Sequence, residues 1–328
     1  MVSVSVKAPG KPATQVDFPG KTAEQVTVLD LKKAIRARGI KIAELRQRLS
    51  LPDAADPKAR PAVLSEDTHS LAKYGIKESG SEVRCKDLGP QIAWRTVFLA
   101  EYFGPIVIQP LLYHLSTKGH TLYGALHKAG LSFLEATPAY EPSTLQKTVL
   151  ALIVLHYVKR EYETVFVHKF SHATMPFRNI FKNCSHYWLL CGVMTAASFF
   201  RPQYGAAAVK GTVFDNPIWI GAWSLLWVYG EFSNYLTHMN LRSIRTPPGQ
   251  PRNFPKGYGF DQVTCANYWF ESLTWIALTA MTCDGSFALF TAVSVGQMLQ
   301  WALKKHKTYR KEHGKNYPKR NIMIPYIW

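Results

Sequence analysis

The stretch HYVKREYETVFVHKFSHATMPFRNIFKN, from His156 to Asn183, is rich in charged and histidine side chains and lies between two apolar runs. The first run is Thr148–Leu155 (TVLALIVL) and the second is Tyr187–Phe200 (YWLLCGVMTAASFF), and both are typical of membrane or deeply buried helices. Ionisable groups beside such segments are costly unless water, a partner or a ligand satisfies them. From charge alone, a site for an anionic cofactor at the polar face of a membrane enzyme and an ordinary basic cytosolic loop are equally good interpretations.

The composition divides the chain into two parts. The net charge is +17, from 39 Lys and Arg against 22 Asp and Glu, which suits nucleic acid, an anionic membrane surface or phosphorylated ligands. An aromatic content of 13%, with nine Trp, argues against a nucleic-acid tail and favours the membrane–water interface. Residues 1–86 are mixed and polar, whereas long apolar runs dominate from about Ile92. We therefore expect two domains, 1–86 and 87–328.

The ends of the chain and its cysteines carry further information. The start, MVSVSVKAPGKPATQ, has no apolar core of a cleaved signal peptide, so we expect membrane insertion through internal helices and a cytosolic N-terminal domain. The five cysteines form no C-x-x-C pair and no disulfide framework, which is typical of reduced, packed cysteines.

The N-terminal part has the pattern of a small α+β domain. Its expected elements are a strand at Val2–Lys7, a strand at Thr14–Phe18, a short helix at Thr27–Ile35 that extends to Arg48 in one interpretation, and a late segment at Ser81–Leu88. This order, with an L-x-x-Y-G-I segment at Leu71–Ile76, resembles a ubiquitin-like domain. The Pro- and Ala-rich stretch Leu51–Ala62 is expected to be an inserted loop.

The remainder predicts a mainly α, multi-pass transmembrane helical bundle of six or seven helices. The expected segments are Ile92–Leu115, a weaker Thr121–Leu134, Leu145–Val167, Ser185–Phe200, Asn216–Phe232, Glu271–Met281 and Ser286–Leu303. The basic tail Lys304–Arg320 is expected to be cytosolic by the positive-inside tendency.

Motifs for common nucleotide and metal sites are missing from the sequence. There is no G-x-G-x-x-G after a strand and no P-loop, so a bound nucleotide would not use a Rossmann unit. His168 and His172 are spaced four apart, which on a helix places them on one face. Because the other histidines form no second cluster, we expect no metal.

Glu101 lies inside a membrane-length apolar segment, where a carboxylate predicts a function or a partner. In Asn234–Arg245, Arg242 and Arg245 are three apart and, together with Arg160 and Arg178, would suit phosphate groups. A solvated basic loop remains the alternative for this stretch.

A third polar cluster stands at the start of an apolar helix. Asn267 and Glu271 are four apart and flank Tyr268. Such a cluster suits an amide-bearing ring such as nicotinamide, whereas a helix cap would explain Asn267 better than the other two residues.

With these residues assembled, the sequence resembles the steroid 5α-reductase superfamily, and most closely its very-long-chain trans-2-enoyl-CoA reductase branch. The motifs that carry the resemblance are FLAEYFGP (Phe98–Pro105), His156–Cys184, CANYWFESLTW (Cys265–Trp275) and NYPKRNIMIPYIW (Asn316–Trp328). A ubiquitin-like N-terminal domain is also a feature of that branch.

The resemblance implies an NADPH-dependent enzyme of the endoplasmic reticulum membrane that reduces very-long-chain trans-2-enoyl-CoA in the last step of fatty-acid elongation, beside other elongase components and with no nucleic acid. It assigns Tyr268 as proton donor and places Tyr157 and Glu101 at the substrate carbonyl. The cofactor-binding positions that it implies are Arg160, Asn234, Arg242, Arg245, Asn267, Glu271 and Tyr309.

One position departs from the superfamily pattern and leaves a contact open. His238 stands where steroid reductases have an acidic residue, which puts a ribose contact in doubt. A steroid or polyprenal reductase of the same fold, a non-catalytic elongase scaffold and a metal-dependent desaturase are the alternatives to the enoyl-CoA reductase.

Overall fold

The computed structural model describes residues 1–52, 61–76, 80–119, 124, 127–128, 130, 138–170, 173–246 and 253–327. The chain divides into two compact units, one built on Met1–Ala93 and the other on the chain from Trp94 onward. Most of the expected inserted loop and of the weak segment Thr121–Leu134 lies outside the described residues, and so does His172.

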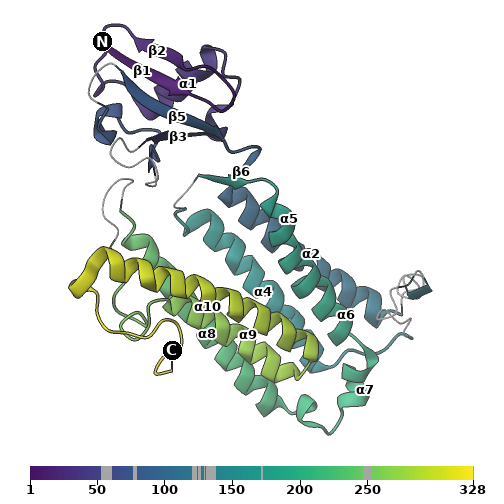
Figure 1. Ribbon diagram of the computed structural model, residues 1–328. Helices are drawn as coiled ribbons and strands as arrows, with labels where there is room; N and C mark the ends of the chain where they lie inside the picture. The colour runs from purple at the N-terminus through teal and green to yellow at the C-terminus, as the bar shows by residue number, and fades with distance from the viewer. Residues whose placement is uncertain are drawn as a thin grey trace. The chain divides into compact units, whose positions relative to one another are not determined.

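The first unit is a five-stranded sheet with one helix across it (Figure 1). The strand order is β2-β1-β5-β3-β4, with β1 and β5 parallel and the other pairs antiparallel. The bounds are β1 Val2–Lys7, β2 Thr14–Phe18, β3 Gln47–Leu51, β4 Ala62–Val63, β5 Ser81–Asp87 and helix α1 Val28–Ala37. Alternate strand residues such as Val4 and Val83 meet Leu31 and Ile35 of α1 in one core.

Helix α1 begins at a capping box and ends earlier than its longer predicted form. The Thr27 hydroxyl accepts the Asp30 N–H, and the Asp30 carboxylate accepts the Thr27 N–H, both at 3.1 Å. The backbone N–H of Thr27 also holds the pKa of Asp30 below its usual value. The extension to Arg48 was wrong, because Gln47–Leu51 forms β3, which pairs with β5 and buries alternate residues.

Short elements complete this unit. They are the 3₁₀ turns η1 (Glu44–Arg46) and η2 (Leu71–Tyr74), and the two-stranded pair of β6 (Gln91–Ala93) and β7 (Thr174–Pro176).

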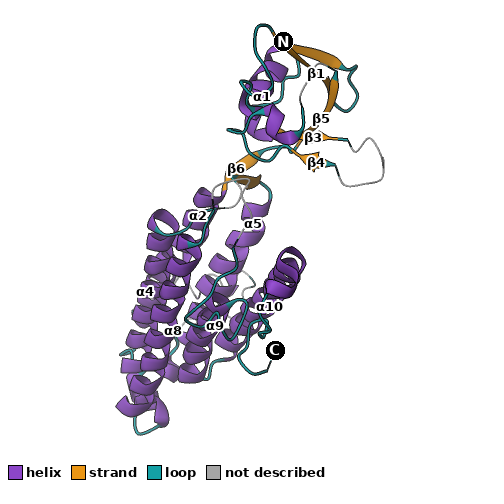
Figure 2. Ribbon diagram, turned by 90° about the vertical axis from the view of Figure 1, so that its left-hand side faces the viewer, coloured by secondary structure: helices purple, strands orange, loops and turns teal. Residues whose placement is uncertain are grey.

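The second unit consists mainly of long helices that lie alongside one another (Figures 1 and 2). The long helices are α2 Trp94–Thr117, α4 Thr144–Phe166, α8 Pro217–Ser243, α9 Ala266–Thr282 and α10 Gly285–His313. A further continuous helical stretch consists of α5 (Asn179–Cys184), the π-helical η3 (Ser185–Met194) and α6 (Thr195–Phe199). The connections contain η4 Pro202–Tyr204, α7 Ala206–Val209, η5 Val213–Asp215 and η6 Gly314–Asn316. The prediction of a mainly helical chain after a small α+β part is confirmed.

Local sequence explains where these helices start. Ser143 and Gln146 form a capping box before α4, Asn216 caps α8 with Pro217 in its first turn, and Asp284 caps α10. The tight α9–α10 connection uses Cys283 in the left-handed conformation, at φ 49°.

Helix α8 is longer than the sequence predicts. The expected helix end at Phe232 was wrong, as was the interpretation of Asn234–Arg245 as a loop, because the helix runs to Ser243. Asn234, Thr237 and His238 are polar but buried, so packing against neighbouring helices extends it.

Among the described residues, two helical stretches, Trp94–Thr117 and Gly285–Asn316, have the length and the apolar composition needed to cross a membrane.

A glycine sets the distance between α8 and α9. A Cβ atom built on Gly230 would lie 2.7 Å from the Thr274 hydroxyl oxygen and 3.1 Å from the Phe270 carbonyl oxygen. The two helix backbones therefore approach closely at this point, one residue before Glu231.

Candidate active site

Buried charged side chains link α4 to α8. Lys159 of α4 lies 2.9 Å from Oε2 of Glu231 and donates to the side-chain oxygen of Asn234 at 2.6 Å. One turn further along α4, Glu163 forms an ion pair with Lys159, in which Oε1 lies 3.3 Å from Nζ. Glu163 is fully buried, so these contacts take the place of water around its charge.

His156 extends this network to α9. Its Nδ1 lies 2.5 Å from Oε1 of Glu231, and its Nε2 lies 3.3 Å from Oε1 of Glu271. The imidazole packs edge-on against Tyr157 and Trp275, with ring centres 4.8 and 5.1 Å away. One histidine thus connects carboxylates from two helices inside an aromatic cage.

Arg160 carries the network toward α2. Its Nη2 donates to the Tyr102 hydroxyl at 2.9 Å, and its Nη1 donates to Glu163 at 2.7 Å. His238 of α8 lies 3.1 Å from the same Glu163 oxygen and 3.4 Å from Arg160 Nη1. Because a buried carboxylate is stable only with partners, Glu163 is the centre on which α4 and α8 meet.

The three polar stretches of the sequence therefore meet in space. His156–Asn183 supplies His156 and Lys159, while Asn234–Arg245 supplies Asn234, whose amide donates to the Asn267 carbonyl at 2.9 Å. Glu271 closes the set through His156.

Tyr157 and Glu101 lie in the aromatic interior beside this network. Tyr157 is fully buried, and its ring lies about 6 Å from those of Tyr102 and Tyr187. Its hydroxyl has no hydrogen bond of ordinary geometry among the described residues, and the Cys191 thiol is its neighbour. Oε2 of the buried Glu101 is likewise without a hydrogen bond in the described part of the chain. Two unsatisfied polar groups in one interior are typical of a site that receives a polar ligand.

Tyr268 faces a different neighbour. It packs against Trp301 of α10, with ring centres 6.1 Å apart, and Lys305 Nζ lies 4.8 Å from the centre of its ring. Asn267, one residue earlier on α9, is buried, whereas Tyr268 is partly exposed. None of the described contacts joins Tyr268 to Tyr157.

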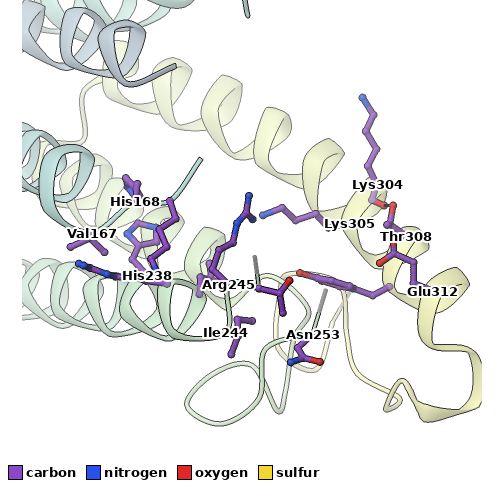
Figure 3. Close-up of a pocket in the computed structure, with 15 residues that line it drawn as sticks. Val167, His168, His238, Ile244, Arg245, Asn253, Lys304, Lys305, Thr308 and Glu312 are labelled. Carbon is purple, nitrogen blue, oxygen red and sulfur yellow. Dashed lines mark hydrogen bonds between the residues drawn. The ribbon is translucent and has the colours of Figure 1, made fainter. Parts of the chain in front are cut away.

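A basic cavity of about 380 Å³ lies between the C-terminal end of α8 and the polar half of α10 (Figure 3). It brings together three predicted cofactor residues, Arg242, Arg245 and Tyr309. The other charged or polar lining side chains are His168, Lys169, His238, Thr246, Asn253, Lys304, Lys305, Thr308 and Glu312. In Figure 3, Lys305 reaches from α10 toward the α8 side, whereas Lys304 points away. A lining with this excess of Lys and Arg suits phosphate groups.

The inner wall of the cavity is shared with the buried network. His238 lines the cavity and contacts Glu163, and the His168 ring packs edge-on against His238 at 4.8 Å. Burial, and after it the charge of Arg160, lowers the pKa of His168 to about 2. The His168 ring in this wall of the cavity is therefore uncharged at neutral pH.

Glu163, His168 and His238 have the side-chain types of a metal site. Their donor atoms lie within 4.8 Å of one another. Arg160 and Lys159 already contact this carboxylate, and a metal cation there would have to displace them or be repelled by them. The donor set therefore does not favour a metal.

The C-terminal segment holds the loop that follows the cavity residue Asn253. Arg320 Nη1 donates to the carbonyls of Pro255, at 2.9 Å, and Phe260, and its guanidinium lies over the rings of Tyr317 and Phe254. Tyr317 stacks on the cavity residue Tyr309, with ring centres 5.8 Å apart.

The sequence located several of these residues and missed others. Arg160, Asn234, Asn267 and Glu271 belong to the buried network or touch it. Sequence reasoning did not single out His156, Lys159, Glu163, Glu231, Lys305 and Arg320 as site residues. The four on α4 and α8 had one available signal, since each is ionisable within or beside an apolar helix.

Comparisons with known proteins identify the family of this chain. Residues 173–328 match the sequence model of the family described as 3-oxo-5-alpha-steroid 4-dehydrogenase. A very-long-chain enoyl-CoA reductase of Dictyostelium discoideum is 38% identical over 311 residues, which cover 93% of each chain. A Schizosaccharomyces pombe protein named "Putative enoyl reductase" is 41% identical over 79% of this chain and 80% of its own. A Caenorhabditis elegans protein named "Probable very-long-chain enoyl-CoA reductase" is 33% identical over 92% of this chain and 91% of its own.

Proposed function

Because this chain belongs to the very-long-chain enoyl-CoA reductase family, we propose that it uses NADPH to reduce very-long-chain trans-2-enoyl-CoA to the saturated acyl-CoA. We assign the reaction to the endoplasmic reticulum membrane, as the last step of fatty-acid elongation beside other elongase components. The observation that carries the proposal is the basic cavity lined by Arg242, Arg245 and Tyr309, whose inner wall continues into the network of Glu163 and His238.

The residues present fit a phosphorylated nicotinamide cofactor. Arg242, Arg245 and Lys305 offer the cations that a diphosphate and a 2′-phosphate require. Asn267 and Glu271 offer an amide and a carboxylate near the network, which suit the nicotinamide carboxamide. When bound, the cofactor supplies the hydride.

Hydride addition to the β-carbon places negative charge on the thioester oxygen, and the α-carbon then takes a proton. We assign Tyr268 as the donor of that proton. The ammonium of Lys305, 4.8 Å from the centre of its ring, would stabilise the phenolate left behind. We place the thioester oxygen by Tyr157 and Glu101, since both offer polar atoms without hydrogen bonds among the described residues.

The membrane arrangement is also a proposal. We infer a multi-pass bundle in which α2 and α10 cross the bilayer with the other long helices, while the N-terminal unit and the basic tail face the cytosol. We further propose that the N-terminal unit is ubiquitin-like, because its sheet has a central parallel pair, β1 and β5, with one helix across it. The bilayer would then receive the acyl tail of the substrate.

The test is NADPH oxidation by purified, detergent-solubilised protein with a long trans-2-enoyl-CoA, and a steroid enone and a polyprenal as competing substrates. The enoyl-CoA should be strongly preferred. Tyr268→Phe should lower kcat by roughly 10²- to 10⁴-fold while NADPH binding, measured by fluorescence, stays intact. Tyr157→Phe tests the other assignment, because it removes the hydroxyl placed at the thioester oxygen, and it should also lower kcat while NADPH binding stays intact. Full activity in Tyr268→Phe would overturn the donor assignment, and preference for a steroid or polyprenal would overturn the substrate.

A further inference from the structure

The outer face of the N-terminal sheet carries an uneven distribution of charge. Helix α1 packs on one face of the sheet (Figure 2), so alternate residues of β1, β3 and β5 lie on the other face. Four of these exposed side chains are basic, namely Lys7, Arg48, Arg84 and Lys86, and we call them the basic sheet face. Lys7 is in register with Arg84, and Arg48 is in register with Lys86, so the four are neighbours across three strands.

Acidic side chains on the same face lie toward the opposite end of the sheet. Glu82 stands two residues before Arg84 and lies 3.5 Å from its Nε, and Asp17 on β2 is in register with Ser3 near the start of β1. The positive charge is therefore concentrated toward the end of the sheet at which β5 finishes.

Two exposed leucines border this end. Leu45 is 60% exposed and Leu88 is 37% exposed. The Leu88 N–H donates to the Arg46 carbonyl at 2.8 Å, so Leu88 stands beside the turn that contains Leu45. Asp87 adds little free negative charge here, because Arg46 pairs with it at 2.5 Å. Basic residues beside exposed apolar ones are typical of surfaces that bind a membrane interface.

The chain leaves the sheet at this same end and enters α2. Only six residues, 88–93, separate Asp87 from Trp94. At full extension they span about 20 Å. If α2 crosses the bilayer, this end of the sheet stays within that distance of the membrane surface.

We propose that the basic sheet face docks on anionic lipid headgroups at the membrane surface, with Leu45 and Leu88 contacting the interfacial layer. This inference rests on the membrane location proposed above. The occupant is lipid because the tether keeps an anionic surface permanently within reach, whereas an acidic protein would have to bind from solution. Each basic residue near an anionic leaflet favours the docked state by roughly fivefold.

The test uses the full chain in lipid nanodiscs, with a donor dye attached enzymatically at the N-terminus and an acceptor on the lipid headgroups. Energy transfer should be higher in discs rich in phosphatidylserine than in phosphatidylcholine discs. The difference should vanish when salt rises from about 0.15 M to about 1 M, because the screening length falls from about 8 Å to about 3 Å.

The decisive variant is Arg48→Glu/Lys86→Glu, which replaces two attractive charges by two repulsive ones and should lower the equilibrium constant for docking by roughly several hundredfold. The matched control is Lys33→Glu/Lys41→Glu, which changes the net charge equally at exposed positions on α1 and the turn after it. The control should retain the lipid-dependent transfer.

Equal transfer in anionic and neutral discs would overturn the proposal, and an acidic protein partner would give that result. Equal loss in the control pair would also overturn it. Flotation of the protein with the discs reports membrane insertion, and NADPH oxidation reports catalysis, so failure of either proposed property is distinguishable from failure of docking.

Discussion

Replacing His156 should weaken cofactor binding in a protein that still folds. It joins Glu231 on α8 to Glu271 on α9 through its two ring nitrogens, at 2.5 and 3.3 Å. In His156→Leu, Glu231 keeps Lys159 at 2.9 Å, whereas Glu271 loses the contact that orients it. The damage should therefore fall on Glu271, which we assign to the nicotinamide.

The expected size follows from the loss of the 3.3 Å contact between His156 Nε2 and the Glu271 carboxylate. A buried polar contact to a charged group contributes about 1.5–3 kcal/mol. If this contact orients Glu271 for the cofactor, the NADPH dissociation constant in His156→Leu should rise about 10- to 150-fold. The KM of the enoyl-CoA should change far less, because the thioester site is assigned to Tyr157 and Glu101.

The two amide variants give a graded test. In His156→Gln, the amide nitrogen lies near the position of the imidazole Nε2, so a donor toward Glu271 is retained. In His156→Asn, the amide nitrogen lies near the position of Nδ1, so the donor that is retained points toward Glu231. NADPH affinity, measured by fluorescence titration in detergent, should therefore fall in the order wild type, His156→Gln, His156→Asn. A merely structural role for the ring would not produce that order.

The control is His186→Gln on η3, which removes a histidine from the same bundle, where its Nε2 faces Ser294 at 3.3 Å. It should leave NADPH affinity within about twofold, because none of the described contacts joins His186 to Glu231 or Glu271. If His156→Leu folds normally and binds NADPH as tightly as wild type, the bridge has no part in cofactor binding and the reasoning is refuted.

Three further predictions concern stability, each measured by thermal unfolding in detergent. Arg320→Ala should lower stability by about 2 kcal/mol or more and weaken NADPH binding, because it releases the loop that Arg320 holds, whereas the exposed Lys319→Ala should do neither. Gly230→Ala should lower the free energy of unfolding by about 1–3 kcal/mol, because its Cβ would lie 2.7 Å from a side-chain oxygen of α9. The control is Gly221→Ala on the same helix, whose Cβ would meet open space and which should not destabilise the protein. An unchanged stability in Gly230→Ala would contradict the close approach of α8 and α9. His168 has a folded pKa of about 2 against an unfolded value of 6.5, so the unfolded state takes the proton first as pH falls below 6.5. Stability should drop by up to about 2 kcal/mol at pH 5, and His168→Gln should remove that part of the pH dependence.

Local sequence signals located most of the helices. Asn216 with Pro217 marked the start of α8, and Cys283 to Gly285 marked the turn between α9 and α10, because capping and turn chemistry are properties of a few adjacent residues. The end of α8 and the strand β3 were missed, because their conformations depend on burial against distant segments rather than on local propensity.

The candidate site divides in the same way. A carboxylate in an apolar segment identified Glu101, and close spacing identified Asn267 with Glu271. The bridge from Glu231 through His156 to Glu271 was not accessible, because it requires α4, α8 and α9 to be packed side by side. The sequence could not show that Tyr157 lies in the aromatic interior whereas Tyr268 lies against α10, because these positions depend on how the helices pack.

The buried network also accounts for the low hydropathy of the helices around it. Of the described helical stretches, α4 and α8 are not among the two that qualify as membrane spans by length and composition. Lys159, Arg160 and Glu163 lower the hydropathy of α4, yet all three have partners inside the bundle. A composition test counts these charges but not the ion pairs between helices, and a paired charge is far less costly in an apolar surrounding than an isolated one. The weak hydropathy of α4 is therefore a consequence of the site it builds. The same reasoning predicts that Glu163→Gln, which leaves Arg160 and Lys159 short of a counter-charge, should impair insertion and folding of the bundle more than a Gln substitution at the half-buried Glu161, for which the described contacts include no ion pair.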